Sequence, residues 1–409
     1  MSNDKPINII GLGYIGLPTA LSFAANGIKI IGTDYNQEIV DKLNNGEITF
    51  KEEGLEKLFE EAVSKGIQFT NKYVKTNAYI ITVPTPYIKE SKKLDPIYII
   101  NAVENVLDVC EKGTILIIES TVSPGSIDKH IRPIIKKRNF KIGEDIHLVH
   151  APERIIPGNM IYELINNSRT IGVDDIDIGC IVKSWYKSFC KAEITITSIK
   201  TAELSKVVEN TFRDVNIAFA NELMRICRSE NIDVYELINI CNKHPRVNIL
   251  NPSAGVGGHC ISVDPWFLIG DYPDIVNVIK SARLINSTQP EFVINRIIDI
   301  MKKNKINNFE KVGFYGLTYK ENVDDIRESP TLQVFDKLRE NYKYNFKLYD
   351  PMINKKYMQG QYLDFEEFMS DIDMLVIMVR HDHIIQNLDI IENKVILDTC
   401  NIVENAYKL

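Results

Sequence analysis

The chain has 409 residues, more than one hydrophobic core usually accommodates, so two or three domains are expected. Hydrophobic residues make up 44% and charged residues 25%, which is typical of an ordinary globular protein and excludes a fibrous or disordered one. The formal net charge of -7 argues against binding of a nucleic-acid backbone as the main task. An anionic ligand would have to be held by local basic residues and backbone N–H groups.

The seven cysteines are scattered, without a C-x-x-C pair or a cluster of cysteine and histidine at zinc spacing. We therefore expect neither a disulfide framework nor a bound metal. The N-terminus lacks the basic and apolar regions of a signal peptide, and no apolar stretch of about eighteen residues occurs. These features predict a cytoplasmic protein that does not bind a membrane.

Short apolar runs alternate with amphipathic stretches from residue 7 onward. Such runs are continuous rather than alternating, which indicates a parallel sheet covered by helices on both faces. The expected strands lie at 7–10, 28–34, 78–83 and 114–121, with helical patterns at 21–27 and 38–46. The first part of the chain is therefore predicted to be a doubly wound α/β domain.

The same pattern returns near the C-terminus. Expected strands lie at 311–317, 346–350, 373–379 and 394–400. The letters GTD in the second strand of the first half correspond to LYD in the second half, and IITVPTP corresponds to VIMVRHD. We therefore predict an α/β protein with two Rossmann-like doubly wound domains.

The section between these halves has few strand signals. It begins with a long helical pattern over 200–232, which would span the diameter of a domain, link the two halves and serve as a dimer spine. Its segment 215–223 is apolar on more than one face, which predicts burial. The expected domains are 1–198, a helical dimerisation region at 199–300, and 301–409.

A glycine-rich turn follows the first expected strand. Gly11, Gly13 and Gly16 form G-x-G-x-x-G at the start of a helix, and Asp34 ends the next strand. In this setting the glycines allow a tight turn and close approach of a pyrophosphate, whereas the triad alone could be only a turn. A carboxylate at Asp34 accepts hydrogen bonds from ribose hydroxyls and repels a 2′-phosphate, so NAD is predicted as the cofactor.

The second α/β half lacks this triad. It has only Gly313 and Gly316, with Lys320 nearby, which favours a different phosphate compound as its ligand.

The long helix carries a polar stripe of Glu203, Lys206 and Asn210. One interpretation is a solvated surface. The other is a site in which the lysine polarises a substrate oxygen and stabilises an alkoxide or oxyanion.

Cys260 lies in GVGGHCISVD, at residues 255–264. A free cysteine is usually a small buried apolar side chain. Here Gly257 and Gly258 could leave the backbone open to a ligand, and Asp264 could act in acid/base catalysis. A thiol beside nicotinamide can capture an aldehyde as a thiohemiacetal, which a second oxidation converts to a thioester.

Several motifs together resemble the UDP-glucose/GDP-mannose dehydrogenase family. The resemblance covers nearly the whole chain in order: GLGYIG (11–16), VPTP (83–86), ESTVSPG (119–125), APER (151–154), AELSKVVENTFRDVNIAFANEL (202–223), GVGGHCISVDPWF (255–267) and GLTYKENVDDIRESP (316–330). It implies oxidation of the C6 alcohol of a nucleotide sugar to the uronate with two NAD molecules. It also implies a homodimer whose two Rossmann-like domains are joined by a helical core.

The resemblance assigns roles by position. The family's nucleophile falls on Cys260, and the lysine and asparagine that stabilise oxyanions fall on Lys206 and Asn210. The aspartate that works with this lysine on water falls on Asp264.

Further positions follow in the same way. A threonine that positions water falls on Thr121, and a glutamate proposed as the acid/base of thioester hydrolysis falls on Glu153. The resemblance implies NAD contacts at Gly11, Gly13, Tyr14, Ile15, Gly16, Asp34, Thr85 and Thr121. It implies substrate contacts at Arg154, Lys206, Asn210, Arg246, Gly257, His259, Lys320 and Arg327, where Arg246 would reach the sugar site of the partner subunit.

Three positions depart from the pattern of UDP-glucose dehydrogenases. His259 replaces a tyrosine, Val263 replaces a lysine and Pro157 replaces a second acid. The form of these motifs is similar to the branch that oxidises UDP-N-acetylhexosamines, and the mannosamine epimer is the expected substrate. UDP-N-acetylglucosamine, UDP-N-acetylgalactosamine and UDP-glucose remain alternatives. A two-electron dehydrogenase of the 6-phosphogluconate type and a non-catalytic NAD-binding protein are more remote ones.

Overall fold

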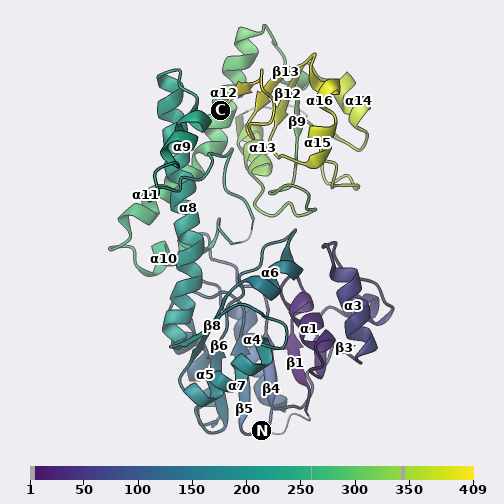
Figure 1. Cartoon of the computed structure of the whole chain (residues 1–409), viewed down its shortest axis with the longest axis vertical. Coiled ribbons are helices and arrows are strands. Elements are labelled where there is room, and N and C mark those ends of the chain that lie inside the picture. The colour runs from purple at the N-terminus through teal and green to yellow at the C-terminus, as the bar shows by residue number, and fades with distance from the viewer. Residues whose placement is uncertain (1–4, 259, 342–345) are drawn as a thin grey trace. The chain divides into compact units, whose positions relative to one another are not determined.

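A computed structural model describes residues 5–258, 260–341 and 346–409 (Figure 1). The chain forms two compact units. The first comprises the chain up to Glu209 together with Trp266–Asp271, and the second comprises Asn210–Pro265 and Tyr272–Leu409. Within the described ranges, no helix has the length and apolar character needed to cross a membrane.

The first unit is built on a sheet with the strand order β3-β2-β1-β4-β5-β6-β7-β8. Its strands are β1 (Ile7–Ile10), β2 (Ile30–Thr33), β3 (Gln68–Thr70), β4 (Ala78–Ile81), β5 (Thr114–Ile118), β6 (Ile146–His150), β7 (Arg169–Val173) and β8 (Ile194–Thr197). The central strands β1, β4 and β5 are buried along their whole length, because both faces of the sheet are covered.

Helices of the first unit connect these strands. They are α1 (Gly16–Ala25), α2 (Gln37–Asn44), α3 (Leu55–Ser64), α4 (Ile97–Val109), the π-helical turn η1 (Ile127–Ile131) with α5 (Arg132–Lys137), α6 (Met160–Asn166) and α7 (Ile176–Tyr186). Figure 1 shows α1 and α3 side by side, and residues of both join one core with β1 and β2. The side chain of Asn36 caps α2 by accepting a hydrogen bond from Glu38 N.

The second unit contains a parallel sheet in the order β11-β10-β9-β12-β13-β14. Its strands are β9 (Val312–Tyr315), β10 (Lys347–Tyr349), β11 (Gln361–Tyr362), β12 (Met374–Ile377), β13 (Val395–Asp398) and β14 (Tyr407–Lys408). The short η2 (Phe309–Lys311) precedes β9, and the helices among these strands are α13 (Pro330–Asn341), α14 (Phe365–Ser370), α15 (Asp382–Gln386) and α16 (Leu388–Ile391).

The middle of the chain is helical. Its helices are α8 (Ile199–Ser229), α9 (Val234–Cys241), α10 (Asp264–Asp271), α11 (Asn277–Ser287) and α12 (Gln289–Lys303). α8 contains neither glycine nor proline, which allows 31 residues to remain in one helix. It begins in the first unit and ends in the second.

The predicted apolar runs all contain strands of the two sheets, and the predicted long helix corresponds to α8. Two expectations need correction. The first sheet is not wholly parallel, because β6 and β7 pair antiparallel. The segment 215–223 is not fully buried within the chain, because Ala218 and Ala220 are buried whereas Phe219 is 50% exposed. The division into three domains at 198 and 300 stays a prediction.

The two sheets share one backbone arrangement. β1 lies between β2 and β4 as β9 lies between β10 and β12. Gly11 N donates to Thr33 O over 2.8 Å, and Gly316 N donates to Tyr349 O over 2.9 Å. The correspondence expected from the repeated letters therefore extends to equivalent hydrogen bonds.

Candidate functional site

The turn after β1 has the shape that the glycine triad predicts. Gly11 adopts a φ of +92°, and a Cβ on Gly16 would lie 1.8 Å from Gly11 O. A Cβ on Gly13 would meet nothing within 4 Å. Gly11 and Gly16 thus close the turn onto the start of α1, while Gly13 leaves open space beside the N-terminal end of that helix. This is the cradle that a pyrophosphate requires.

Asp34 lies at the end of β2, next to this turn. Its Oδ2 accepts from Leu12 N over 2.8 Å, and its Oδ1 accepts from Asn36 N over 2.9 Å. Each carboxylate oxygen has a further lone pair, so Asp34 can also accept from ribose hydroxyls. The residues of this turn therefore fit NAD.

The other predicted NAD contacts lie in the same unit. Tyr14 packs against Phe50 with ring centroids 4.5 Å apart and the rings tilted by 35°, and Ile15 is half-buried. Thr85 is buried after β4, and Thr121 is half-buried after β5. Because β1, β4 and β5 are neighbouring parallel strands, these residues lie at the same edge of the sheet, where α/β folds bind ligands.

Glu153 belongs to a buried ionic cluster that sequence reasoning missed. The guanidinium of Arg169 forms ion pairs with both Glu153 and Glu119, and its Nη1 lies 3.1 Å from Glu119 Oε1. Glu153 Oε1 also accepts from Arg154 N over 2.7 Å. Burial, more than repulsion by Glu153, raises the pKa of Glu119 to about 8, although Arg169 opposes the shift.

Arg154, a predicted substrate contact, is engaged within the first unit. Its guanidinium forms an ion pair with Glu209 and donates to Ser168 O over 2.8 Å and to Thr170 Oγ1 over 3.1 Å. A role in substrate binding would have to use its remaining donor capacity or replace one of these partners.

The polar stripe on α8 is buried, so the interpretation as a solvated surface is wrong. Glu203 is 1% exposed and accepts from Gly125 N (2.6 Å) and Ile127 N (2.9 Å), so it has a structural task. Lys206 is 6% exposed, and no hydrogen bond or ion pair engages its ammonium in the described part of the chain. A buried ammonium in this state is available to an anionic or polarised ligand.

In the second unit, Asn210 and Asp264 form a buried pair. The amide of Asn210 donates to Asp264 Oδ2 over 2.6 Å, and both residues are at most 6% exposed. Asp264 N in turn donates to Cys260 O over 2.9 Å, so one turn of chain joins the carboxylate to the cysteine. Cys260 itself is exposed, whereas Cys227 in the same unit is buried. The interpretation of Cys260 as a small buried apolar residue is therefore wrong.

The residue after Cys260 is contacted by a second buried ion pair. Arg283 on α11 lies 2.7 Å from Asp214 on α8, and both side chains are buried. Arg283 also reaches Ile261 O over 3.4 Å, and Asn286 donates to Asp214 Oδ1 over 2.8 Å. Sequence reasoning missed this support, because the paired residues are distant along the chain.

Gly257 and Gly258 are needed for a reason other than the one expected. A Cβ on Gly257 would lie 2.7 Å from Glu328 O, and one on Gly258 would lie 2.8 Å from the Tyr319 ring. Gly258 N donates to Arg327 O over 3.0 Å. The close approach is thus made by the chain's own segment 316–330, and no ligand is required to explain the glycines.

This packing brings the cysteine segment against the loop that carries Lys320 and Arg327. Lys320 is half-buried, and Arg327 has 44% of its side chain exposed beside Asp325, with Nε 2.9 Å from Asp325 Oδ1. Two cationic side chains therefore lie on the loop that touches the segment 255–258.

The remaining predicted positions are less informative. Arg246 is exposed after α9, Val263 is buried and Pro157 is half-buried. His259 lies outside the described residues.

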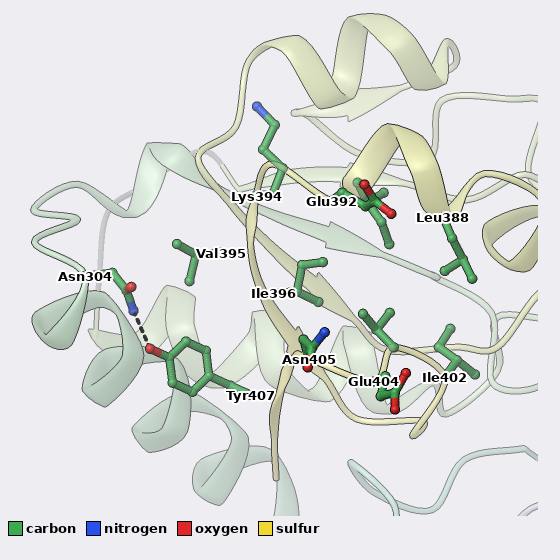
Figure 2. Close-up of a pocket in the computed structure, with 12 residues that line it drawn as sticks. Asn304, Leu388, Glu392, Lys394, Val395, Ile396, Ile402, Glu404, Asn405 and Tyr407 are labelled. Atoms are coloured by element: carbon green, nitrogen blue, oxygen red, sulfur yellow. Dashed lines mark hydrogen bonds between the residues drawn. The ribbon is translucent and has the colours of Figure 1, made fainter.

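A cavity of about 840 Å³ opens elsewhere in the second unit, between the end of α12, β13, β14 and α16 (Figure 2). Figure 2 shows Asn304 donating to the hydroxyl of Tyr407, over 3.3 Å, at one side of this cavity. Of the residues predicted from the sequence, none lines it.

Comparison with known proteins gives consistent results along the chain. Three models of the UDP-glucose/GDP-mannose dehydrogenase family match: the NAD binding domain at residues 5–190, the central domain at 200–288 and the UDP binding domain at 313–405. The UDP-N-acetyl-D-mannosamine dehydrogenase of Methanococcus maripaludis is 39% identical, over 98% of this chain and 94% of that protein.

Solved structures of similar proteins point to the same family. The UDP-D-ManNAc dehydrogenase of Pyrococcus horikoshii is similar with a TM-score of 0.91 and 34% identity, covering 98% of this chain and 96% of that one. The UDP-N-acetyl-mannosamine dehydrogenase of Staphylococcus aureus has a TM-score of 0.87 and 38% identity, covering 98% and 97%. With its NAD-binding turn, its second nucleotide-binding fold and a match over nearly its whole length, this chain belongs to the UDP-glucose/GDP-mannose dehydrogenase family.

Proposed function

We propose that this enzyme oxidises the C6 alcohol of UDP-N-acetyl-D-mannosamine to the uronate in a four-electron reaction. One observation carries the chemistry: an exposed Cys260 is joined through one turn of chain to the buried Asn210–Asp264 pair. A two-electron alcohol dehydrogenase has no use for such a thiol, whereas oxidation beyond the aldehyde requires a nucleophile.

The choice of sugar rests on similarity. The relatives from Methanococcus maripaludis, Pyrococcus horikoshii and Staphylococcus aureus, described above, are all named for this substrate. His259, Val263 and Pro157, which depart from the pattern of UDP-glucose dehydrogenases, favour the same choice.

NAD would be held by Gly11, Gly13, Gly16 and Asp34, and two NAD molecules, bound in turn, would supply the hydride acceptors for the two oxidations. Lys206 and Asp264 take part in removal of the proton from the C6 alcohol. The charge of the Lys206 ammonium, which no carboxylate of the described residues neutralises, would stabilise the alkoxide.

Cys260 acts on the aldehyde. Its Sγ forms a bond to C6 while the carbonyl π bond opens to an oxyanion, which Lys206 and Asn210 stabilise and which then takes a proton. Loss of the second hydride from C6 to a second NAD, together with loss of the hydroxyl proton, would leave a thioester. Water adds to that carbonyl, the C6–S bond breaks, and the uronate and the Cys260 thiol are released.

Hydrolysis of the thioester needs a base near C6. We assign this task to Glu153, with Thr121 positioning the water. Glu153 forms an ion pair with Arg169, and its carboxyl group is the one we assign to accept a proton from the water.

The diphosphate of the substrate would contact Lys320 and Arg327 on the loop 316–330. Arg154 and Gly257 complete the substrate site, as does His259, which lies outside the described residues. Arg246 would come from the partner subunit of a homodimer. The cytoplasmic location stays a prediction.

The test is turnover of the purified enzyme on UDP-N-acetylmannosamine, UDP-N-acetylglucosamine, UDP-N-acetylgalactosamine and UDP-glucose, with NADH counted per sugar. We expect the mannosamine epimer to give the highest kcat/KM and two NADH per molecule. Cys260→Ala should lose uronate formation by at least about 10³-fold, because it removes the covalent intermediate.

Preference for UDP-glucose would refute the choice of sugar. One NADH per sugar, with Cys260→Ala fully active, would refute the four-electron chemistry. Tight NAD binding without turnover of any nucleotide sugar would support a non-catalytic protein instead.

A further inference from the structure

His381 is a completely buried histidine in the second unit, after β12, and the site described above does not use it. Asn322 N donates to its Nδ1 over 3.0 Å. Its Nε2 lies 3.3 Å from Asp350 Oδ2 and 3.3 Å from Thr318 Oγ1. Because a backbone N–H can only donate, Nδ1 must be unprotonated, so the proton of the neutral ring is on Nε2.

His381 occupies the place that Thr85, a predicted NAD contact, occupies in the first unit. Thr82 N donates to Ile10 O at the end of β1, and Met378 N donates to Tyr315 O at the end of β9. Three residues beyond Thr82 and Met378, the chain reaches Thr85 and His381.

Asp350 likewise corresponds to Asp34. Asp350 Oδ2 accepts from Leu317 N over 2.6 Å, just as Asp34 Oδ2 accepts from Leu12 N. In the first unit this carboxylate has lone pairs left for a ribose. In the second, Asp350 also accepts from Thr318 N over 3.0 Å and faces the Nε2–H of His381.

The space for a dinucleotide in the second unit is thus filled by the protein. Thr318, which is fully buried, takes the place of Gly13. A nucleotide bound by this unit must therefore depend on other groups, of which the cationic Lys320 and Arg327 lie on the adjoining loop.

The beginning of this loop is tied to the segment after β12. Asn322 has a φ of +56°, its N–H donates to His381, and its Oδ1 accepts from Asp382 N over 3.1 Å. Thr318 Oγ1 donates to Lys320 O over 3.0 Å. The backbone on both sides of the Lys320 side chain is therefore held through Thr318 and Asn322.

The remainder of the loop is held by hydrogen bonds to Asp325. Tyr319 N donates to Asp325 O over 3.0 Å, and Arg327 N donates to Asp325 Oδ1 over 3.0 Å. Release of Asn322 would thus loosen the closed segment 319–325, which contains Lys320 and to which Arg327 is bonded through Asp325.

We propose that His381 is a positioning residue for substrate binding: its Nδ1 holds Asn322 and thereby keeps Lys320 and Arg327 arranged for the diphosphate of the UDP sugar. The proposal rests on the function proposed above, because only that function makes these two side chains ligands of UDP. It assigns His381 no contact with the reacting atoms.

Two near-isosteric substitutions separate the two hydrogen bonds of the ring. In His381→Asn, the side-chain oxygen takes about the place of Nδ1 and can accept from Asn322 N, while the donor to Asp350 is lost. In His381→Gln, the amide nitrogen takes about the place of Nε2 and can donate to Asp350, while the acceptor for Asn322 is lost.

The measurements are calorimetric titration with UDP, steady-state kinetics with UDP-N-acetylmannosamine, and hydrogen exchange of peptides covering 316–329. For His381→Gln we expect UDP binding and KM to weaken about fivefold to tenfold, kcat to stay within about twofold, and the Asn322 amide to exchange faster. His381→Asn should remain near the wild type in all three.

His383→Gln is the matched control, because His383 lies two residues further on and bonds to the Tyr315 hydroxyl (3.2 Å) instead of the loop. It should leave UDP binding unchanged. Wild-type UDP binding by His381→Gln, or equal weakening in His381→Asn and His381→Gln, would overturn the proposal.

If His381→Gln does not fold, hydrogen exchange of the wild-type enzyme tests the role of His381 instead. The Asn322 amide must be protected without ligand and protected further by UDP, and an unprotected amide would refute the role of His381. A wild-type enzyme that does not bind UDP would instead contradict the proposed function, and exchange of the Asn322 amide would still test its bond to His381.

Discussion

Glu119 shares the single guanidinium of Arg169 with Glu153, and all three side chains are buried. Two ionised carboxylates beside one guanidinium would leave a net buried charge, so one bound proton is favourable. Other titratable side chains near this cluster are those of Arg154, Tyr186 and His150. Arg154 follows Glu153, and Tyr186 lies under the guanidinium with its ring centroid 4.5 Å from Arg169 Cζ. His150 bonds to Ile118 O, directly before Glu119.

The pKa of Glu119, raised mainly by burial to about 8, predicts a pH dependence of stability. Between about pH 4.5 and 8 the folded state binds a proton that the unfolded state has lost, so stability falls as pH rises through this window. Glu119→Gln mimics the protonated acid and should remove that fall. Between pH 6 and 9, we expect the Tm of Glu119→Gln to fall by roughly 5 °C less than the Tm of the wild type.

Thermal unfolding at a series of pH values checks this result. Glu60→Gln, which changes an exposed glutamate, should reproduce the wild-type pH dependence. Parallel Tm curves for the wild type and Glu119→Gln would contradict a shared proton.

At the scale of single residues, sequence reasoning selected positions from local motifs, and their roles stay predictions. Asn210, Asp264 and Cys260 stood in recognisable motifs, and the structure joins them by short hydrogen bonds. It missed Glu119 and Arg169, which pair across 50 residues and have no local pattern. It recognised Gly257 and Gly258 but not the contact that requires them, because the neighbouring loop is about 70 residues away in the chain.

At the scale of elements, continuous apolar runs correctly predicted eight strands of the two sheets: β1, β2, β4, β5, β9, β10, β12 and β13. Such runs identify strands that are buried on both faces, as β1 and β12 are. The strands β6, β7 and β8 escaped prediction, as did the edge strands β3, β11 and β14, because two or three residues are too short a run to carry a comparable signal. The antiparallel pairing of β7 has no mark in its own sequence, since pairing direction depends on the path of the chain before it.

The turn between β1 and α1 permits a prediction that separates folding from cofactor binding. Gly13→Ala should leave Tm nearly unchanged, because the new Cβ meets no protein atom within 4 Å. If the pyrophosphate of NAD lies there, the methyl group should raise KM for NAD about tenfold or more. Steady-state kinetics and thermal unfolding check the two parts.

Gly16→Ala provides the contrast. Its Cβ would lie 1.8 Å from Gly11 O and should lower Tm as well as NAD affinity. An unchanged KM for NAD in Gly13→Ala would place the pyrophosphate elsewhere.

At the scale of the whole molecule, two α/β units share one backbone scheme and differ in what fills the space after the first strand. Open space at Gly13 suits a dinucleotide, whereas Thr318 and His381 fill the equivalent space in the second unit. The repeated letters in the sequence predicted this duplication. They could not predict the different contents, because His381 and Thr318 meet only after β9, β10 and β12 are assembled.

The part of α8 within the second unit presents an apolar face. Phe212, Phe219 and Ile226 are 65%, 50% and 54% exposed, and their spacing of seven residues places them on one side of the helix. Such large exposed side chains at regular intervals are typical of a surface that a second copy covers.

We therefore expect the wild-type enzyme to sediment as a dimer at micromolar concentration and Phe219→Asp to shift it toward monomers, because the substitution would bury a charge in the apolar contact. Arg213→Asp introduces the same side chain on another face of α8 and should leave the dimer intact. If Arg246 acts on the substrate of the partner subunit, Phe219→Asp should also lose activity at concentrations where it is monomeric, and recover it as the concentration rises. Sedimentation velocity and kinetics over the same concentration range test both statements, and a wild-type monomer with full activity would refute them.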